Sequence, residues 1–154
     1  MNNILVVDDE VGVCCVIQHL LVRQGYPVTI MTDGRAALGA VARDEYAAAL
    51  IDLNLAEIDG NEVIRAARAA RPDMRIVMMS GMVLESGCGA PDFPRMSARI
   101  PGLYRLAKPF KPTDLIQLVQ DILSVPALSV PAGDALAWPA APRFESPAAV
   151  PARR

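Results

Sequence analysis

The sequence predicts an α/β fold, an open, doubly wound sheet of five parallel strands with helices on both faces. Short continuous apolar runs, typical of strands buried on both faces, alternate along the chain with segments of helical period. Polar residues follow these runs, at the sheet edge where such folds place their chemistry. The expected strands are Ile4–Val7, Val28–Met31, Ala47–Ile51, Ile76–Met79 and Leu103–Ala107.

The first two expected helices lie between the first three strands. Val13, Ile17 and Leu21 recur at four-residue spacing, so they share one helix face. Gly25 is suited to ending that helix. A second helix is expected over residues 36–43, where Asp33 can cap its first turn.

Two further helices follow the third and fifth strands. One begins after Gly60 and ends before Pro72, because proline cannot continue a helix. The last begins at Pro112, which suits a first helical turn. Its inward face comprises Leu115, Ile116, Val119 and Ile122. The fourth unit, from Gly81 to Gly102, is rich in glycine and proline, so its helix should be short or irregular.

The chain of 154 residues has room for one ordinary domain and a tail. We expect the domain over residues 1–124. Proline and alanine dominate residues 125–154, which predicts a disordered or extended tail. This tail contains Trp138, which is either part of a docking motif or simply an exposed apolar residue.

Charge and hydropathy limit the location and partners of the protein. The net charge is −2, with both signs interspersed, so no nucleic-acid partner is expected. No apolar run approaches the ~18 residues of a membrane span, and the N-terminus lacks the pattern of a signal peptide. A cytoplasmic protein without a membrane partner is therefore expected.

The three cysteines, Cys14, Cys15 and Cys88, fit no metal-binding spacing and are odd in number. Adjacent cysteines rarely form a disulfide with each other. We therefore expect all three to be buried as small hydrophobic residues in a reducing compartment.

Five polar residues are predicted to converge at the carboxyl edge of the sheet. They are Asp8, Asp9, Asp52, Ser80 and Lys108. Each of these residues alone is weak evidence for a functional site. An acidic pair after a strand, for example, is more often a helix cap than a metal site. Three neighbouring carboxylates repel one another, and a hard cation such as Mg²⁺ removes that conflict. The combination predicts a magnesium site.

Such a site suits phosphoryl transfer to a carboxylate. Asp52 can attack phosphorus as a nucleophile, while Lys108 and the Ser80 hydroxyl contact phosphoryl oxygens. Phosphoryl transfer demands mostly positioning and charge stabilisation, so no histidine base is required. His19, which lies mid-helix away from this edge, is expected to be structural or exposed.

The motifs at these positions resemble the receiver domain of two-component response regulators, over about residues 2–124. They are Val7-Asp8-Asp9-Glu10, Asp52-Leu53-Asn54-Leu55, Asp59-Gly60, Ser80-Gly81 and Lys108-Pro109-Phe110. The resemblance implies a flavodoxin-like sheet with strand order 2-1-3-4-5. It also implies a stand-alone receiver that accepts phosphate from a histidine kinase or phosphotransfer protein.

The resemblance assigns roles by position. Asp52 would be the phosphoacceptor and a magnesium ligand, Asp9 a direct ligand, and Asp8 a ligand through water. The backbone carbonyl of Asn54 would complete the protein ligands. Ser80 and Lys108 would sense the phosphoryl group, and the Lys108–Pro109 peptide bond would be cis.

Three departures from the family pattern concern signalling rather than chemistry. Ala56 replaces a usual proline after the acceptor. Arg105 occupies the usual position of an aromatic switch residue, and the neighbouring Tyr104 should point to the opposite sheet face. The stretch from Ser80 to Lys108 is also longer than usual.

The expected output is protein–protein contact, because no DNA-binding or enzymatic domain follows. The protein would not be a conventional enzyme, and would assist only its own phosphotransfer and dephosphorylation. One alternative is a receiver-like scaffold that binds partners regardless of phosphorylation. Another is a hydrolase with an aspartyl-phosphate intermediate, although Asn54 stands where those enzymes carry a second aspartate.

Overall fold

The computed structural model describes residues 2–81 and 102–126 of the chain. Its centre is a five-stranded parallel sheet in the order β2-β1-β3-β4-β5. The strands are β1 (Ile4–Val7), β2 (Val28–Met31), β3 (Ala48–Asp52), β4 (Arg75–Gly81) and β5 (Leu103–Lys108). The predicted fold class and strand order are confirmed.

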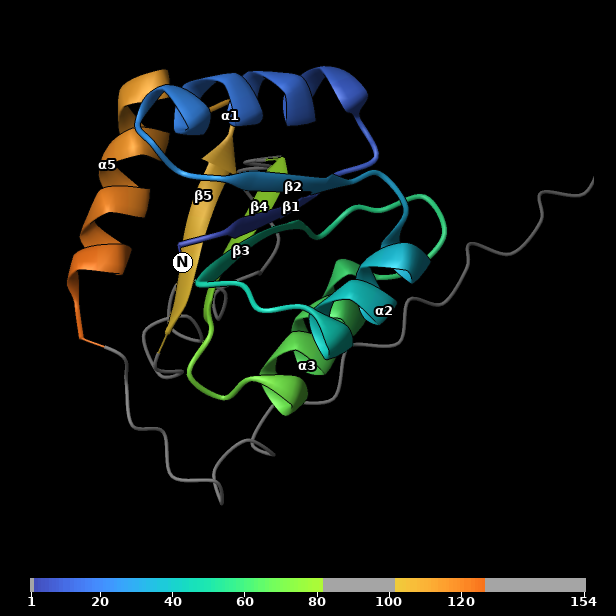
Figure 1. Cartoon of the computed structure of the whole chain (residues 1–154). Helices are drawn as coiled ribbons and strands as arrows, with labels where there is room; N and C mark the ends of the chain where they lie inside the picture. The colour runs from blue at the N-terminus through green and yellow to red at the C-terminus, as the bar shows by residue number, and fades with distance from the viewer. Residues whose placement is uncertain (1, 82–101, 127–154) are drawn as a thin grey trace, which may run out of the picture.

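Helices cover both faces of this sheet (Figure 1). They are α1 (Val11–Arg23), α2 (Gly34–Arg43), α3 (Gly60–Ala70) and α5 (Pro112–Ser124). Helices α1 and α5 lie on one face, and α2 and α3 lie on the other. The predicted irregular fourth helix, Cys88 and the tail with Trp138 fall outside the described residues. No helix in the described part of the chain is long and apolar enough to cross a membrane.

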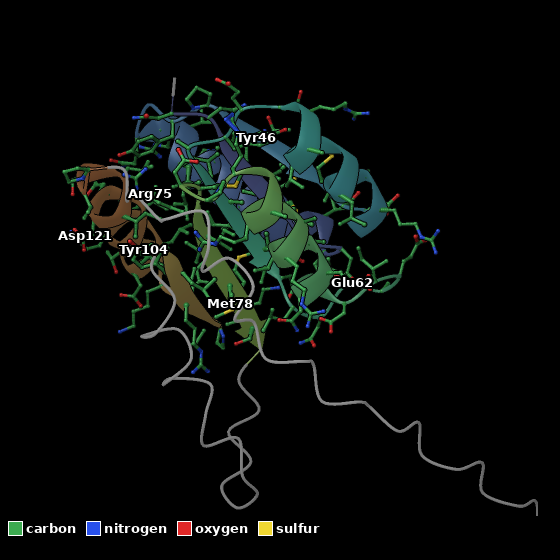
Figure 2. All side chains as sticks on the ribbon, turned by 90° about the horizontal axis from the view of Figure 1, so that it is seen from below. Tyr46, Glu62, Arg75, Met78, Tyr104 and Asp121 are labelled. Atoms are coloured by element: carbon green, nitrogen blue, oxygen red, sulfur yellow. The ribbon has the colours of Figure 1, made fainter. Side chains whose placement is uncertain are left out.

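The two faces of the sheet bury separate hydrophobic clusters. Strand side chains alternate between them, so Ile4 and Val6 pack toward α1 and α5, whereas Leu5 and Val7 pack toward α2 and α3. Figure 2 shows the two helical layers on either side, with Asp121 on α5 and Glu62 on α3. All four residues of β1 are fully buried, which explains its continuous apolar run.

Helix boundaries follow the sequence signals closely. Gly25 has φ 86°, a left-handed conformation suited to glycine, just after α1. The Asp33 carboxylate accepts a hydrogen bond of 2.8 Å from the Arg35 amide, so the predicted cap forms. Helix α2 begins two residues before the predicted start. Helix α3 ends before Pro72, and Pro112 lies in the first turn of α5.

Strand β5 separates Tyr104 from Arg105 as predicted. Arg105 pairs in register with Met78, which belongs to the cluster facing α2 and α3. Tyr104 packs instead against the cluster facing α1 and α5. The parallel pairing of β5 with β4 continues without a bulge from Leu103 to Lys108. Tyr104 therefore does not occupy the side of the sheet on which Arg105 lies.

Candidate functional site

Three charged residues from distant parts of the chain meet at the carboxyl edge of the sheet. Asp8 follows β1, Asp52 ends β3 and Lys108 ends β5. Each continues the alternation of residues that pack toward α1 and α5, such as Val6 before Asp8 and Leu106 before Lys108. The sheet thus brings all three to the same side of the same edge.

The Lys108 ammonium connects the two buried aspartates. Its Nζ lies 2.6 Å from Asp8 Oδ2 and 2.9 Å from Asp52 Oδ2, and the exposed Glu10 carboxylate is 3.9 Å away. Burial by itself lowers the pKa of Lys108, but hydrogen bonds and charge attraction from Asp8 and Asp52 raise the pKa above its usual value. Lys108 therefore remains a cation throughout the physiological pH range.

A third carboxylate completes an acidic cluster. Ligand oxygens of Asp8, Asp9 and Asp52 all lie within 4.8 Å of one another. One ammonium cannot balance three carboxylates, and closely spaced carboxylate oxygens are the ligands that Mg²⁺ prefers. The donor set of this cluster therefore fits Mg²⁺.

Backbone amides hold the two buried carboxylates in position. The Glu10 amide donates to Asp8 Oδ1 at 2.9 Å, and the Asn54 amide donates to Asp52 Oδ1 at 3.1 Å. These bonds leave Oδ2 of both aspartates facing Lys108. The carboxylates are therefore oriented before any ligand arrives.

Gly60 allows the loop after Asp52 to fold back tightly. The Gly60 amide donates to the Leu53 carbonyl at 3.2 Å, and Asn54 pairs with Asp59 in an antiparallel bridge. A Cβ at position 60 would lie 2.1 Å from the Asp52 carbonyl oxygen. The sequence analysis gave Gly60 as a helix start and as part of the Asp59-Gly60 motif, but it missed the steric role of this glycine next to Asp52.

Ser80 and the Lys108–Pro109 peptide bond lie at this edge of the sheet, whereas His19 lies away from it. Ser80 is half-buried and pairs in register with Ala107, one residue beyond the strand pair of Asp52 and Met79. The Lys108–Pro109 peptide bond is cis, as the resemblance implied. His19 is exposed on α1, which is one of the two alternatives expected for it.

The cysteine prediction is correct for Cys14 and wrong for Cys15. Cys14 is buried, and its thiol donates to the Asp8 carbonyl at 3.3 Å. Burial raises its pKa to about 11. Cys15 is exposed, because adjacent helical residues are ~100° apart and cannot both face one core stripe.

An open groove adjoins the acidic cluster. Residues of α1 line one wall, and the end of β4 with the segment after β5 lines the other. The lining residues are Glu10, Gly12, Val13, Val16, Gly81, Lys108, Pro109 and Phe110. The sequence analysis missed this groove. Apolar residues of α1 outside the Cys14–Ile17–Leu21 stripe were the available signal.

Comparison with known proteins identifies the family. The model of the response regulator receiver domain matches residues 4–120. The chain belongs to this family, whose members act in two-component signalling.

Sequence similarity to two regulatory proteins supports membership of this family. The response regulator receiver protein CpdR of Brucella abortus is 28% identical over 123 residues, covering 80% of this chain and 98% of CpdR. The transcriptional regulatory protein ZraR of Escherichia coli is 35% identical over 78 residues, which cover 51% of this chain but only 18% of ZraR. The chain thus aligns with a small part of ZraR and with nearly all of CpdR.

Solved structures share the fold. A receiver protein from Sinorhizobium medicae is 27% identical with a TM-score of 0.67, covering 79% of this chain and 94% of that one. A CheY-like receiver from Methanospirillum hungatei is 24% identical with a TM-score of 0.69, covering 80% and 94%. The latter likeness concerns the fold alone.

Proposed function

We propose that this chain is a cytoplasmic receiver phosphorylated on Asp52 by a histidine kinase or a histidine phosphotransfer protein, with Mg²⁺ as cofactor. The observation that carries the proposal is the contact of Lys108 with both Asp8 and Asp52, next to Asp9. A single, largely buried cation beside three carboxylates suits a site that must receive both a metal and a phosphoryl group.

In the proposed reaction, Asp52 is the nucleophile. Its Oδ2 forms a bond to phosphorus as the bond from phosphorus to the donor histidine nitrogen breaks, and the imidazole leaves. Asp52 Oδ1 stays hydrogen-bonded to the Asn54 amide, which fixes the carboxylate plane. Lys108, already 2.9 Å from Oδ2, then pairs with a phosphoryl oxygen, and the Ser80 hydroxyl donates to another.

The acidic cluster would hold the metal. We assign Asp9 and Asp52 as direct ligands, Asp8 as a ligand through water, and the Asn54 carbonyl as a further ligand. When bound, Mg²⁺ neutralises charge on the phosphoryl oxygens during transfer. Asp8 also anchors Lys108 at 2.6 Å, so its carboxylate orients the cation toward Asp52.

The groove next to Lys108 is the proposed docking place of the phosphodonor. Val13, Val16 and Phe110 give it apolar walls, and it leads to the ammonium that contacts Asp52. A partner helix carrying the phosphohistidine can bury apolar residues there while its imidazole reaches the acceptor. We further propose that residues 1–124 are the signalling unit, residues 125–154 a disordered tail, and the output a protein contact.

Beryllofluoride with Mg²⁺ tests this function directly. It mimics an acyl phosphate, and the receiver TrrA of Thermotoga maritima, 23% identical with a TM-score of 0.64, was solved in complex with Mg(2+)-BeF. NMR spectra should shift around Asp52 in the wild type and not in Asp52→Asn. Acetyl phosphate should add one phosphoryl group to the wild type alone.

The matched control is Asp121→Asn, which removes an exposed carboxylate on α5 outside the site. This variant should respond as the wild type does. A wild type that neither reagent changes, or an Asp52→Asn protein that responds equally, would show the proposal to be wrong.

A further inference from the structure

Helix α2 begins against the loop that follows the phosphoacceptor. Gly34, the first residue of α2, is buried. A Cβ atom at this position would lie 2.6 Å from Cγ1 of Ile58, 2.9 Å from Cδ1 of the same residue and 3.1 Å from Cδ1 of Leu55. Carbon atoms in ordinary contact are about 3.5–4.0 Å apart. The side chains of Ile58 and Leu55 therefore occupy the space that a side chain on residue 34 would need.

The backbone of Gly34 does not itself require glycine. Its φ is not positive, unlike that of Gly25. Alanine is a better helix former than glycine, so helix propensity alone favours alanine at this position. Gly39 lies in the same helix, and a Cβ atom there would come no closer than 3.6 Å to its nearest neighbour, Arg43. The close approach of Ile58 therefore distinguishes position 34 from position 39.

The loop from Leu53 to Asp59 is fixed at both of its ends. The Leu53 amide donates to the Met79 carbonyl at 2.9 Å, and Asp59 caps the start of α3. The sequence between these ends contains no proline that would fix a backbone angle. Leu55 and Ile58 are half-buried and pack against the hydrophobic cluster that faces α2 and α3. Their contact with the start of α2 therefore adds a fixed point in the middle of the loop.

Asn54 belongs to this loop and contacts the phosphoacceptor directly. Its amide donates to Asp52 Oδ1 at 3.1 Å, and the residue pairs with Asp59 in an antiparallel bridge. Leu55 follows Asn54 in the chain, and Ile58 precedes Asp59. Because peptide units are rigid, a displacement of Leu55 and Ile58 is passed to Asn54 from both sides. Mg²⁺ demands near-ideal octahedral geometry, so a small displacement of the Asn54 carbonyl would weaken its proposed contact with the ion.

We propose that Gly34 is a positioning residue for the phosphoacceptor site. Because it has no side chain, Ile58 and Leu55 can lie against the start of α2, and this contact holds Asn54 where its amide orients Asp52. The metal-binding role of the Asn54 carbonyl rests on the proposed function, whereas the bond of its amide to Asp52 does not depend on it. Helix α2 thereby acts on a site to which it contributes no ligand.

A methyl group on residue 34 would displace the loop backbone and not only the end of one side chain. Cγ1 of Ile58 is bonded directly to Cβ, and isoleucine is stiff about χ1. Rotation that moves only Cδ1 leaves the 2.6 Å approach in place. The backbone at Ile58 must therefore move away from α2, and the bridge between Asn54 and Asp59 moves with it.

Gly34→Ala tests this role, and Gly39→Ala is its matched control, because each variant adds one methyl group to α2. In EDTA, Gly34→Ala should shift the NMR signal of the Asn54 amide, and Gly39→Ala should not. Gly34→Ala should also raise the Mg²⁺ dissociation constant about fivefold, measured by NMR titration, and slow acetyl phosphate labelling to a similar degree. An unchanged Mg²⁺ affinity in Gly34→Ala, or an equal loss in Gly39→Ala, would overturn the proposal.

Ile58→Ala supplies a rescue that a merely destabilising change would not show. It removes Cγ1 and Cδ1 of residue 58, so it makes room for the methyl group of Gly34→Ala. Adding Gly34→Ala to the Ile58→Ala protein should change the Mg²⁺ dissociation constant by less than about twofold. Equal losses of Mg²⁺ affinity in the two backgrounds would contradict the proposal, because Gly34 would then not act through Ile58.

The double variant also decides the case in which Gly34→Ala alone does not fold. The protein with both changes should then fold and bind Mg²⁺ as Ile58→Ala does, and a double variant that stays unfolded would overturn the proposal. A wild type that binds Mg²⁺ but takes no phosphoryl group on Asp52 would contradict the proposed function alone. The Asn54 amide shift and the Mg²⁺ affinities of the variants would still decide the role of Gly34.

Discussion

Lys108 Nζ lies 2.6 Å from Asp8 Oδ2, although one hundred positions separate the two residues in the chain. The same nitrogen lies 2.9 Å from Asp52 Oδ2. One largely buried ammonium thus joins the carboxyl ends of β1, β3 and β5. This arrangement makes Lys108 a structural cation as well as a candidate for phosphoryl contact.

Replacing Lys108 with methionine should therefore destabilise the metal-free protein. Methionine keeps most of the side-chain volume, but the buried carboxylates of Asp8 and Asp52 lose their counter-ion. We expect a loss of about 2–3 kcal/mol in the free energy of unfolding, somewhat below the value for fully buried pairs because the site opens to solvent. Urea denaturation of both proteins in EDTA measures this difference in the free energy of unfolding. The exposed Lys111→Met variant is the control, and equal stabilities of the two variants would contradict the prediction.

The stability difference between wild type and Lys108→Met should also depend on pH in the alkaline range. The contacts with Asp8 and Asp52 raise the pKa of Lys108 in the folded state above its unfolded value of about 10.4. Its contribution is thus fully present below about pH 10 and is lost as pH rises through the folded pKa. Denaturation of both proteins between pH 8 and 11.5 tests this. A stability difference between the two proteins that stays constant up to pH 11.5 would refute the prediction.

Magnesium should stabilise the folded protein through Asp9. We expect saturating MgCl₂ to raise the melting temperature of the wild type, because an ion that binds only the folded state adds to its stability. Asp9→Asn should weaken Mg²⁺ binding at least tenfold and nearly remove this increase. In EDTA, the same variant should be at least as stable as the wild type, because it removes one of three neighbouring carboxylates. Asp121→Asn should behave as the wild type in both conditions.

Two glycine-to-alanine changes should act in opposite directions. At Gly60 the added methyl would meet the Asp52 carbonyl oxygen at 2.1 Å, so the backbone must move. We expect Gly60→Ala to lose about 2–3 kcal/mol of stability and to slow acetyl phosphate labelling of Asp52.

At Gly12 no atom lies within 4 Å of the new methyl, so Gly12→Ala should stabilise the protein by about 0.5–1 kcal/mol through alanine's better helix propensity. Thermal unfolding compares them, and a neutral Gly60→Ala would show that the loop accommodates a side chain.

The sequence was sufficient to predict the sheet, and the meeting of Asp8, Asp52 and Lys108 at its edge, because local and global signals agree there. The β1 run Ile4–Val7 is buried on both faces, and the aspartates follow directly where the strands end. Parallel strands then bring Asp8, Asp52 and Lys108 to one edge without knowledge of any loop.

What the sequence could not provide depends on contacts between distant atoms. The 2.1 Å approach at Gly60 arises from how the loop after β3 returns to Asp52, and no local pattern records it. Cys15 was expected to be buried because cysteine usually is. The stripe of Cys14, Ile17 and Leu21 fills the core side of α1 instead, and Cys15 is left facing solvent.

The two adjacent cysteines should differ sharply in thiol reactivity. Burial raises the pKa of Cys14 from 9.0 to about 11, which lowers its thiolate fraction about 100-fold near pH 8 and adds to its inaccessibility. In a Cys88→Ser protein, Ellman's reagent should therefore modify one thiol rapidly, and Cys15→Ser should remove that fast phase. Unfolding in urea should make both thiols react at similar rates. Rapid modification of Cys14 in the folded Cys15→Ser protein would mean that α1 separates from β1 often enough to expose the Asp8 carbonyl contact.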